Sequence, residues 1–148
     1  KSLKKYIDDN LFGTDIIVTG HSLGGGIATL TALYLSKKGY NVKCFTYGAP
    51  RVGDSKFCKL FNESKIENHR IVNDMDPVPL LPWPLRFKHV DGVKWLDNDK
   101  IHHIHRRINC FKYFKRFFLS LFGFTNNITN DHGCPKYMYE IDQIFSNV

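Results

Sequence analysis

The sequence predicts an α/β fold built on a mainly parallel sheet, and three features support this prediction. Short runs rich in apolar and β-branched residues alternate with helical patterns along the chain. Residues 15–19 (DIIVT) form an apolar run of the kind that is buried in a parallel sheet. A G-x-S-x-G pattern follows this run and precedes an apolar helical stretch. We therefore expect a strand, a sharp turn and a buried helix in that order.

Length and composition indicate one globular unit. The chain has 148 residues, of which 43% are hydrophobic and 14% aromatic, and this excludes a disordered or low-complexity chain. It carries 21 basic and 14 acidic side chains, which give a formal net charge of +7. Residues 100–130 hold six of the basic side chains and no acidic one, so the basicity is local. We expect the four cysteines to be buried free thiols, although an oxidising compartment would allow pairing: Cys44, Cys58, Cys110 and Cys134.

Patterning and turn signals predict the remaining elements. They are a buried helix over residues 26–36, strands over 41–47 and 69–73, a short helix capped by Asp54 that ends at Phe61, and a terminal helix over 135–145. Gly39 is typical of a residue that ends a helix in a left-handed conformation. The pair Asp91-Gly92 predicts a hairpin that joins strands over residues 86–90 and 93–96.

A basic and aromatic insert over residues 106–124 has helical periodicity. Its polar residues recur at three- and four-residue steps and leave a wide phenylalanine face. This helix could lie in an anionic membrane interface, or it could pack against another part of the protein. The interface hypothesis assigns three phenylalanines to the acyl region and three cations to the phosphates: Phe114, Phe117, Phe118, Lys112, Lys115 and Arg116.

The segment Gly20-His21-Ser22-Leu23-Gly24 has the G-x-S-x-G form. Between a strand and a helix, this pattern holds a nucleophilic serine on a sharp, strained turn. We expect glycine at positions 20 and 24 because a side chain would collide with its neighbours there. The Leu23 N–H, at the start of the following helix, is expected to bind an oxyanion. The alternative is a glycine-rich turn that binds a phosphate or nothing.

A serine nucleophile needs a base and a carboxylate, and in strand-turn-helix hydrolases the chain order is Ser, acid, His. Asp76 is the favoured acid because it follows a predicted strand and precedes two prolines that stiffen its loop. Asp74 is the alternative, and one of the two is expected to cap the turn. His132 is the favoured base because its loop comes after all the predicted strands. It could instead be a surface histidine beside the terminal helix.

The other histidines fit the role of base less well. His21 and His69 precede the favoured acid, so chain order excludes them. His89 falls in a predicted hairpin strand, where a core or surface role is more typical. Three more alternate as in an exposed strand: His102, His103 and His105. They have no cysteine or carboxylate at ligand spacing, so we predict no metal site, and the chemistry requires no cofactor.

Three blocks of the sequence together resemble the class 3 (fungal-type, triacylglycerol) lipase family. They are residues 18–26 (VTGHSLGGG), 45–54 (FTYGAPRVGD) and 72–79 (VNDMDPVP), and the later FKHV over 87–90 and Asp131-His132 also fit. The resemblance implies an α/β-hydrolase fold, hydrolysis of acylglycerol esters, and a triad of Ser22, Asp76 and His132. It favours Asp76 over its neighbour Asp74.

Two features depart from the family pattern. The family has further strands, a lid and a second oxyanion donor upstream of the serine, whereas only 21 residues precede Ser22 here. We therefore expect residues 1–148 to be the C-terminal half of one lipase-like domain, with the N-terminal half supplied in cis or in trans. The strand over 15–19 would otherwise be a bare sheet edge. The second departure is the insert over 106–124.

These patterns favour a serine ester hydrolase that acts on acylglycerol lipids through an acyl-enzyme. One alternative is a non-catalytic membrane-binding module derived from a hydrolase, and another is a phospholipid or galactolipid acyl hydrolase. Nucleic acid is not an expected partner, because the chain lacks RRM, KH and zinc-finger patterns. The compartment stays open, with a secreted or membrane-surface location favoured weakly.

Overall fold

The computed structural model describes residues 5, 14–73, 76–97, 100–102 and 132–146. Within them a five-stranded sheet runs in the order β1-β2-β3-β4-β5. The first four strands are parallel neighbours, and the last pairs antiparallel with β4. The bounds are β1 Asp15–His21, β2 Asn41–Tyr47, β3 Glu67–Asn73, β4 Val93–Asp97 and β5 Lys100–His102. The predicted α/β class and its mainly parallel sheet are confirmed.

Helices connect the strands close to the positions predicted. They are α2 Leu23–Lys37, α3 Ser55–Asn62, the 3₁₀ helix η1 Val78–Leu80 and α6 Cys134–Ser146. Asp54 caps α3 as expected, because its side chain accepts a 2.8 Å hydrogen bond from the Phe57 N–H. Gly39 ends α2 with φ at +90°, and the Tyr40 N–H donates back to the Leu35 carbonyl, as in a Schellman cap. The α2 helix begins three residues earlier than predicted, directly after Ser22.

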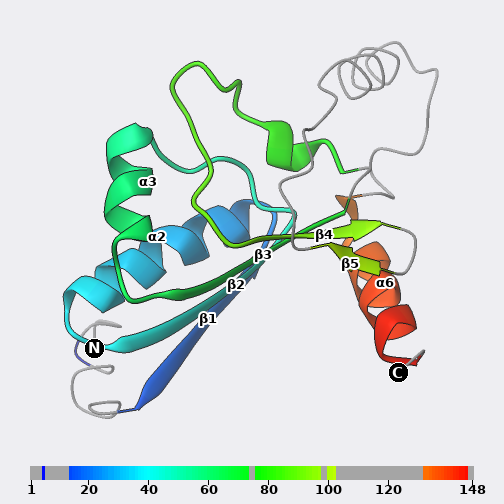
Figure 1. The fold of residues 1–148 in the computed structure, drawn as a ribbon, viewed down its shortest axis with the longest axis horizontal. Coiled ribbons are helices and arrows are strands. Elements are labelled where there is room, and N and C mark those ends of the chain that lie inside the picture. The colour runs from blue at the N-terminus through cyan, green and yellow to red at the C-terminus, as the bar shows by residue number, and fades with distance from the viewer. Residues whose placement is uncertain (1–4, 6–13, 74–75, 98–99, 103–131, 147–148) are drawn as a thin grey trace.

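Two helices cover one face of the sheet and one helix covers part of the other. The core lies between α2, α3 and the even-numbered side chains of β2, and it includes Leu33, Val42, Cys44 and Phe61. Because side chains alternate along a strand, Tyr47 projects from the opposite face. There it meets Tyr137 of α6, with ring centroids 6.3 Å apart. Figure 1 shows α6 on the side of the sheet away from α2 and α3.

The predicted hairpin around Asp91-Gly92 is wrong. Residues 86–90 form no strand, and β4 pairs in parallel with β3 instead. The turn is fixed at the start of β3, where the Arg70 N–H donates to the Gly92 carbonyl at 2.8 Å. The Asp91 carbonyl likewise accepts from the Asn68 side-chain amide at 2.5 Å. The open side of β3 thus takes up β4 in place of a local hairpin partner.

The expectation that α2 is a buried helix is also wrong within the described residues, whereas β1 is the bare sheet edge expected where no strand lies beside it. The β1 strand lies at the edge of the sheet, and Ile17 is 65% exposed. Along α2, one helical stripe at steps of three and four residues is exposed: Leu23, Ile27, Leu30 and Tyr34. We call these four residues the α2 stripe. The sequence pattern anticipates a covering layer on this side, and no described residue supplies it.

The cysteine prediction is confirmed in part. Cys44 and Cys58 are buried free thiols, and burial raises the pKa of the Cys44 thiol to about 11. Cys134 is also free but exposed, because it begins α6 at the surface. Cys110 and the insert over 106–124 lie outside the described residues. No helix in the described part of the chain is long and apolar enough to cross a membrane.

Replacing Gly92 by alanine should destabilise the protein more than the same change at Gly39. Both glycines have φ near +90°, where alanine is strained by about 1–3 kcal/mol. Only at Gly92 would the new Cβ also meet a backbone atom, the Asn68 carbonyl oxygen at 2.3 Å. Urea unfolding of the two variants measures this difference. Equal losses of stability would show that the turn does not constrain β4.

Candidate active site

Ser22 occupies the strained turn between β1 and α2. Its φ of 57° and ψ of −129° lie outside the regions that non-glycine residues favour. The Ser22 N–H donates to the Tyr47 carbonyl at 2.9 Å, which ties the turn to the end of β2. The Ser22 carbonyl accepts from Gly25 and Gly26 at the start of α2. These bonds hold the serine at the carboxyl end of the sheet.

Close backbone packing explains one of the two glycines expected to be essential in this turn. A Cβ at Gly20 would lie 2.3 Å from the Gly24 carbonyl oxygen, so no side chain fits there. The expectation for Gly24 is wrong, because a Cβ at that position would meet nothing within 4 Å among the described residues. Gly24 contributes its carbonyl to the contact and faces outward. Gly25 is the second crowded position, where a Cβ would lie 2.7 Å from the Ala49 side chain.

Three side chains that the sequence analysis selected lie in a hydrogen-bonded row. His132 Nε2 is 2.7 Å from Ser22 Oγ, and His132 Nδ1 is 2.9 Å from Asp76 Oδ2. They come from the turn after β1, the segment after β3 and the residues before α6. With Nδ1 donating to the carboxylate, Nε2 is free to accept from the serine hydroxyl. The geometry therefore suits the transfer of the serine proton to the imidazole.

The Asp76 carboxylate is almost completely buried, with 2% exposure. Its Oδ1 accepts from the Val78 N–H at 2.8 Å, and its Oδ2 accepts from the Tyr137 hydroxyl at 2.6 Å as well as from His132. Three donors thus compensate for the loss of water around this carboxylate. The competing residue, Asp74, lies outside the described residues.

Tyr137 is the site residue that the sequence analysis did not single out. It is 1% exposed, and its hydroxyl also accepts from the Asn73 N–H at 3.1 Å. Burial raises its pKa well above the usual range, and the neighbouring Asp76 charge adds to the effect. The hydroxyl therefore stays protonated and donates to the carboxylate. Its position five residues after the candidate base, in the first turns of α6, was the available signal, because the helix directs that side chain back toward the sheet.

His21 supports the base rather than replacing it. Its Nε2 lies 2.7 Å from the His132 carbonyl oxygen and therefore donates to it. The two imidazole rings pack with centroids 4.7 Å apart. Chain order excluded His21 as the base, and its bond to the backbone of His132 instead ties the residue before the serine to the base.

The remaining histidines lie away from this row or outside the described side chains. His69 bonds Glu67 at 2.8 Å and stacks on Phe45. His89 donates to the Pro79 carbonyl at 2.6 Å, and burial lowers its pKa to about 3, with the nearby Arg70 charge as a further cause. The backbone of His102 lies in β5, and nothing is described of His103 and His105.

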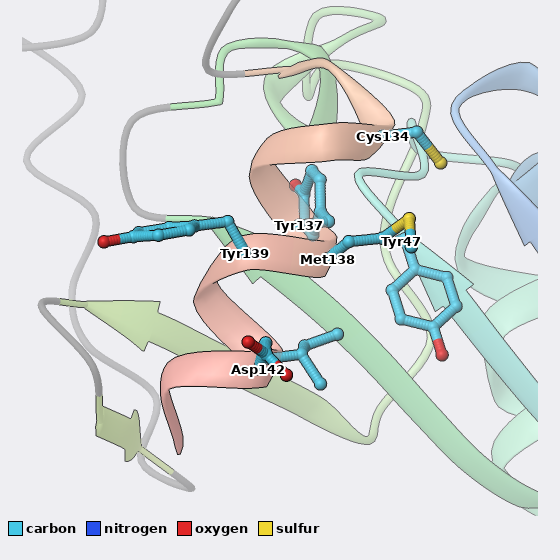
Figure 2. A pocket seen from close by; sticks show the side chains of 7 residues that line it. Tyr47, Cys134, Tyr137, Met138, Tyr139 and Asp142 are labelled. Atoms are coloured by element: carbon cyan, nitrogen blue, oxygen red, sulfur yellow. The ribbon is translucent and has the colours of Figure 1, made fainter. Parts of the chain in front are cut away.

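An apolar cavity of about 540 Å³ lies beside the row. It is lined by Tyr47, Cys134, Tyr137, Met138, Tyr139, Ile141 and Asp142. Figure 2 shows Met138 pointing from α6 toward Tyr47, while Tyr139 points away along the other side of the helix. Tyr137 thus belongs both to the lining of this cavity and to the contacts of the buried carboxylate.

Comparison with known proteins gives a family match over the first part of the chain. A model described as Lipase (class 3) matches residues 1–85, a stretch that contains Ser22 and Asp76 and ends before His132. The chain is 43% identical over 83 residues to the secreted mono- and diacylglycerol lipase 1 of Fusarium solani. It is 42% identical over 76 residues to phospholipase A1-II 1 of Oryza sativa subsp. indica.

Solved structures of lipases share the fold. The triacylglyceride lipase of Rhizomucor miehei superposes with a TM-score of 0.60 at 34% identity, covering 67% of this chain and 41% of that one. For the Penicillium cyclopium MDLA variant the TM-score is 0.58 at 33% identity, covering 68% and 40%. The two sequence alignments cover 55% and 48% of this chain but 25% and 19% of the relatives. This chain therefore aligns with only a quarter or less of those relatives.

Replacing Gly48 by alanine should disrupt the row of Ser22, His132 and Asp76. A Cβ at Gly48 would lie 2.5 Å from Asp76 Oδ2 and 3.2 Å from His132 Nδ1. We expect the reaction of Ser22 with a fluorophosphonate to slow by roughly 100-fold, because misplaced catalytic groups cost about that factor. Gly39→Ala is the matched control, with a positive φ but open space around it. A reaction rate equal to that of the control would contradict the role of Gly48.

Tyr137→Phe should weaken the hold on Asp76 without changing the shape of α6. Hydrogen bonds to charged groups contribute about 1.5–3 kcal/mol, so we expect labelling of Ser22 to slow by about 10- to 100-fold. Tyr139→Phe removes a hydroxyl from a tyrosine that is 56% exposed and should change nothing. Labelling rates and thermal unfolding of the two variants test this assignment. Equal rates in both would leave Tyr137 with a packing role only.

Proposed function

The chain belongs to the class 3 lipase family, and we propose that it carries the catalytic triad of an acylglycerol ester hydrolase. The observation that carries the proposal is the hydrogen-bonded row from Ser22 Oγ through His132 to Asp76 Oδ2. The family match supports it independently, since the matched stretch includes both the serine and the carboxylate. A structural neighbour with a TM-score of 0.58 is described as a triacylglycerol lipase whose catalytic centre is a serine protease triad.

In the proposed mechanism, His132 acts as the general base. Its Nε2 takes the Ser22 hydroxyl proton as the alkoxide attacks an ester carbonyl, and Asp76 stabilises the imidazolium that forms. The proton then passes to the leaving alcohol as the acyl-enzyme forms. Water, deprotonated by His132, hydrolyses the acyl-enzyme and restores the free serine. The first proton transfer uses the 2.7 Å contact between His132 Nε2 and Ser22 Oγ, while the 2.9 Å contact between His132 Nδ1 and Asp76 orients the imidazole.

We assign the Leu23 N–H as one oxyanion donor. It lies at the start of α2, where the helix dipole favours negative charge. Gly25 and Gly26 are committed to the Ser22 carbonyl, so their N–H groups are already occupied. A full oxyanion hole needs another donor, and losing one donor costs about 10²- to 10³-fold in rate. We propose that this donor lies outside the described residues.

We further propose that residues 1–148 form the C-terminal part of a single α/β-hydrolase domain. The edge of β1, which no described strand pairs with, suits coverage by further strands of that domain, and the exposed Ile17 and the α2 stripe suit coverage by further strands and helices. This missing part could belong to the same polypeptide or to a separate chain. It would bring the second oxyanion donor to the turn that carries Ser22.

Acylglycerols are the favoured substrates, and phospholipids are the second candidate. A secreted mono- and diacylglycerol lipase and a phospholipase A1 resemble the chain at 43% and 42% identity, so the comparisons support both head-group classes. The mono- and diacylglycerol lipases that resemble this chain are named as secreted proteins, which supports a secreted location. The insert over 106–124, proposed to contact an anionic membrane, lies outside the described residues and stays a prediction.

A fluorophosphonate probe and matched lipids test the proposed activity. The probe should label the chain, and Ser22→Ala should abolish labelling, because the probe reacts with an activated serine. Fatty-acid release from diacylglycerol and from phosphatidylcholine with identical acyl chains should favour diacylglycerol. Release from phosphatidylcholine alone would support the second candidate.

Ser55→Ala is the control, because Ser55 is an exposed serine at the start of another helix. This variant should label as the parent chain does. Labelling that persists in Ser22→Ala, or is lost equally in the control, would exclude Ser22 as the nucleophile. A folded chain that the probe does not label would favour a non-catalytic module.

A further inference from the structure

An exposed apolar loop lies between η1 and β4, over residues 81–88 (LPWPLRFK). We call it the 81–88 loop. Its four large apolar side chains all face solvent, with exposures of 42%, 61%, 87% and 39% for Leu81, Trp83, Leu85 and Phe87. Two exposed cations, Arg86 and Lys88, alternate with them, and the loop contains no acidic residue. Such a cluster is unfavourable in water and marks a surface that meets a partner.

The base of the 81–88 loop is held firmly. At its start, the Arg51 N–H donates to the Leu81 carbonyl at 2.7 Å, and the Arg51 guanidinium donates to the Pro82 carbonyl at 2.9 Å. At its end, the Lys88 N–H donates to the Gly53 carbonyl at 2.7 Å. Both ends are therefore fixed to the segment between β2 and α3. This anchoring lowers the conformational entropy that binding would cost.

The 81–88 loop is directly connected to the triad carboxylate. Only four residues separate Asp76 from Leu81, and the Val78 N–H within that connection donates to Asp76 Oδ1 at 2.8 Å. Figure 1 shows the chain rising from η1 away from the sheet before it returns to β4. A surface bound by this loop would thus lie close to the end of the sheet that carries Ser22.

We propose that the 81–88 loop docks on an anionic lipid surface, with Trp83 and Leu85 among the acyl chains and Arg86 and Lys88 on the headgroups. Tryptophan favours the boundary between headgroups and acyl chains, and leucine favours the hydrocarbon. Lysine and arginine near an anionic leaflet add electrostatic attraction, which a neutral protein groove would not supply. The α2 stripe has equally large apolar groups, but residues 23–34 contain no cation, and from Leu23 the stripe runs along the helix away from the triad end.

Vesicle binding measured on Ser22→Ala tests the proposal without any turnover, so it succeeds or fails separately from the proposed hydrolysis. The Ser22→Ala chain should bind phosphatidylcholine vesicles that contain phosphatidylglycerol. Trp83→Ser with Leu85→Ser should lower the partition coefficient by roughly 30-fold or more, because two large apolar groups no longer enter the hydrocarbon. Leu30→Ser with Tyr34→Ser, the matched pair on the α2 stripe, should leave binding unchanged.

The cations are tested with a second pair of variants. Arg86→Gln with Lys88→Gln should weaken binding to the anionic vesicles by roughly 10-fold or more and remove most of its salt dependence. Binding to pure phosphatidylcholine should hardly change. Lys37→Gln with Lys38→Gln makes the same charge change at the far end of α2 and should have little effect.

Tryptophan fluorescence tests insertion without altering the loop. The chain has two tryptophans, and Trp95 is buried with an indole N–H that has no hydrogen-bond partner among the described residues. Trp95→Phe therefore loses no known bond and leaves Trp83 as the only indole. Its emission should shift to the blue on vesicles and be quenched by brominated acyl chains.

Four results would overturn the proposal. Vesicles that do not bind the chain would show that the loop has another partner, such as a protein. Loop variants that bind as tightly as the parent would assign binding to another surface, as would an equal loss in the α2 stripe variants. An unquenched Trp83 on bound vesicles would show that the loop stays in water.

Discussion

The buried carboxylate of Asp76 is the constraint on which the site depends. A charge that is 2% exposed must be compensated by hydrogen bonds, and the compensation comes from three directions. The Val78 N–H fixes the turn that starts η1, the Tyr137 hydroxyl fixes α6, and the His132 imidazole fixes the segment before that helix. The hydrogen bonds that compensate this one carboxylate therefore also fix the position of His132. The Tyr137 hydroxyl extends the effect, since it also accepts from the Asn73 N–H at the end of β3.

The parallel sheet brings the parts of the site together. Strands β1, β2 and β3 run in the same direction, so the turn with Ser22, the turn with Gly48 and the loop with Asp76 meet at one edge. Gly48 is the point of closest approach, because its missing side chain leaves room for the Asp76 carboxylate and the Tyr137 hydroxyl. The strain at Ser22 is supported by the bond from its N–H to the Tyr47 carbonyl. The strained turn at the end of β1 is thus held by a hydrogen bond to the end of the neighbouring strand β2.

Two exposed apolar surfaces differ in chemistry and therefore in the partners that they fit. The α2 stripe follows helical periodicity on a regular element beside an open sheet edge, a form that suits further protein layers. The 81–88 loop contains two prolines and interleaves aromatic, aliphatic and basic side chains, a form that suits a lipid interface. The first surface supports the proposed coverage by a further part of the domain, and the second supports the proposed docking on lipid.

The sequence by itself determined the α/β class, the turn with Ser22, and Asp76 and His132 as its partners. Those predictions rest on local signals: apolar runs, turn residues, caps and chain order. Only the tertiary structure decided that Asp91-Gly92 leads into a strand parallel to β3, because pairing depends on which distant strand has a free edge. It also revealed that Tyr137 bonds Asp76 and that His21 bonds the His132 carbonyl, and it showed that a side chain at Gly24 would not collide with its neighbours among the described residues. The contacts of Tyr137 with Asp76 and of His21 with His132 join residues 61 and 111 positions apart, and they leave no local pattern, since they exist only once the parallel strands have brought these segments together.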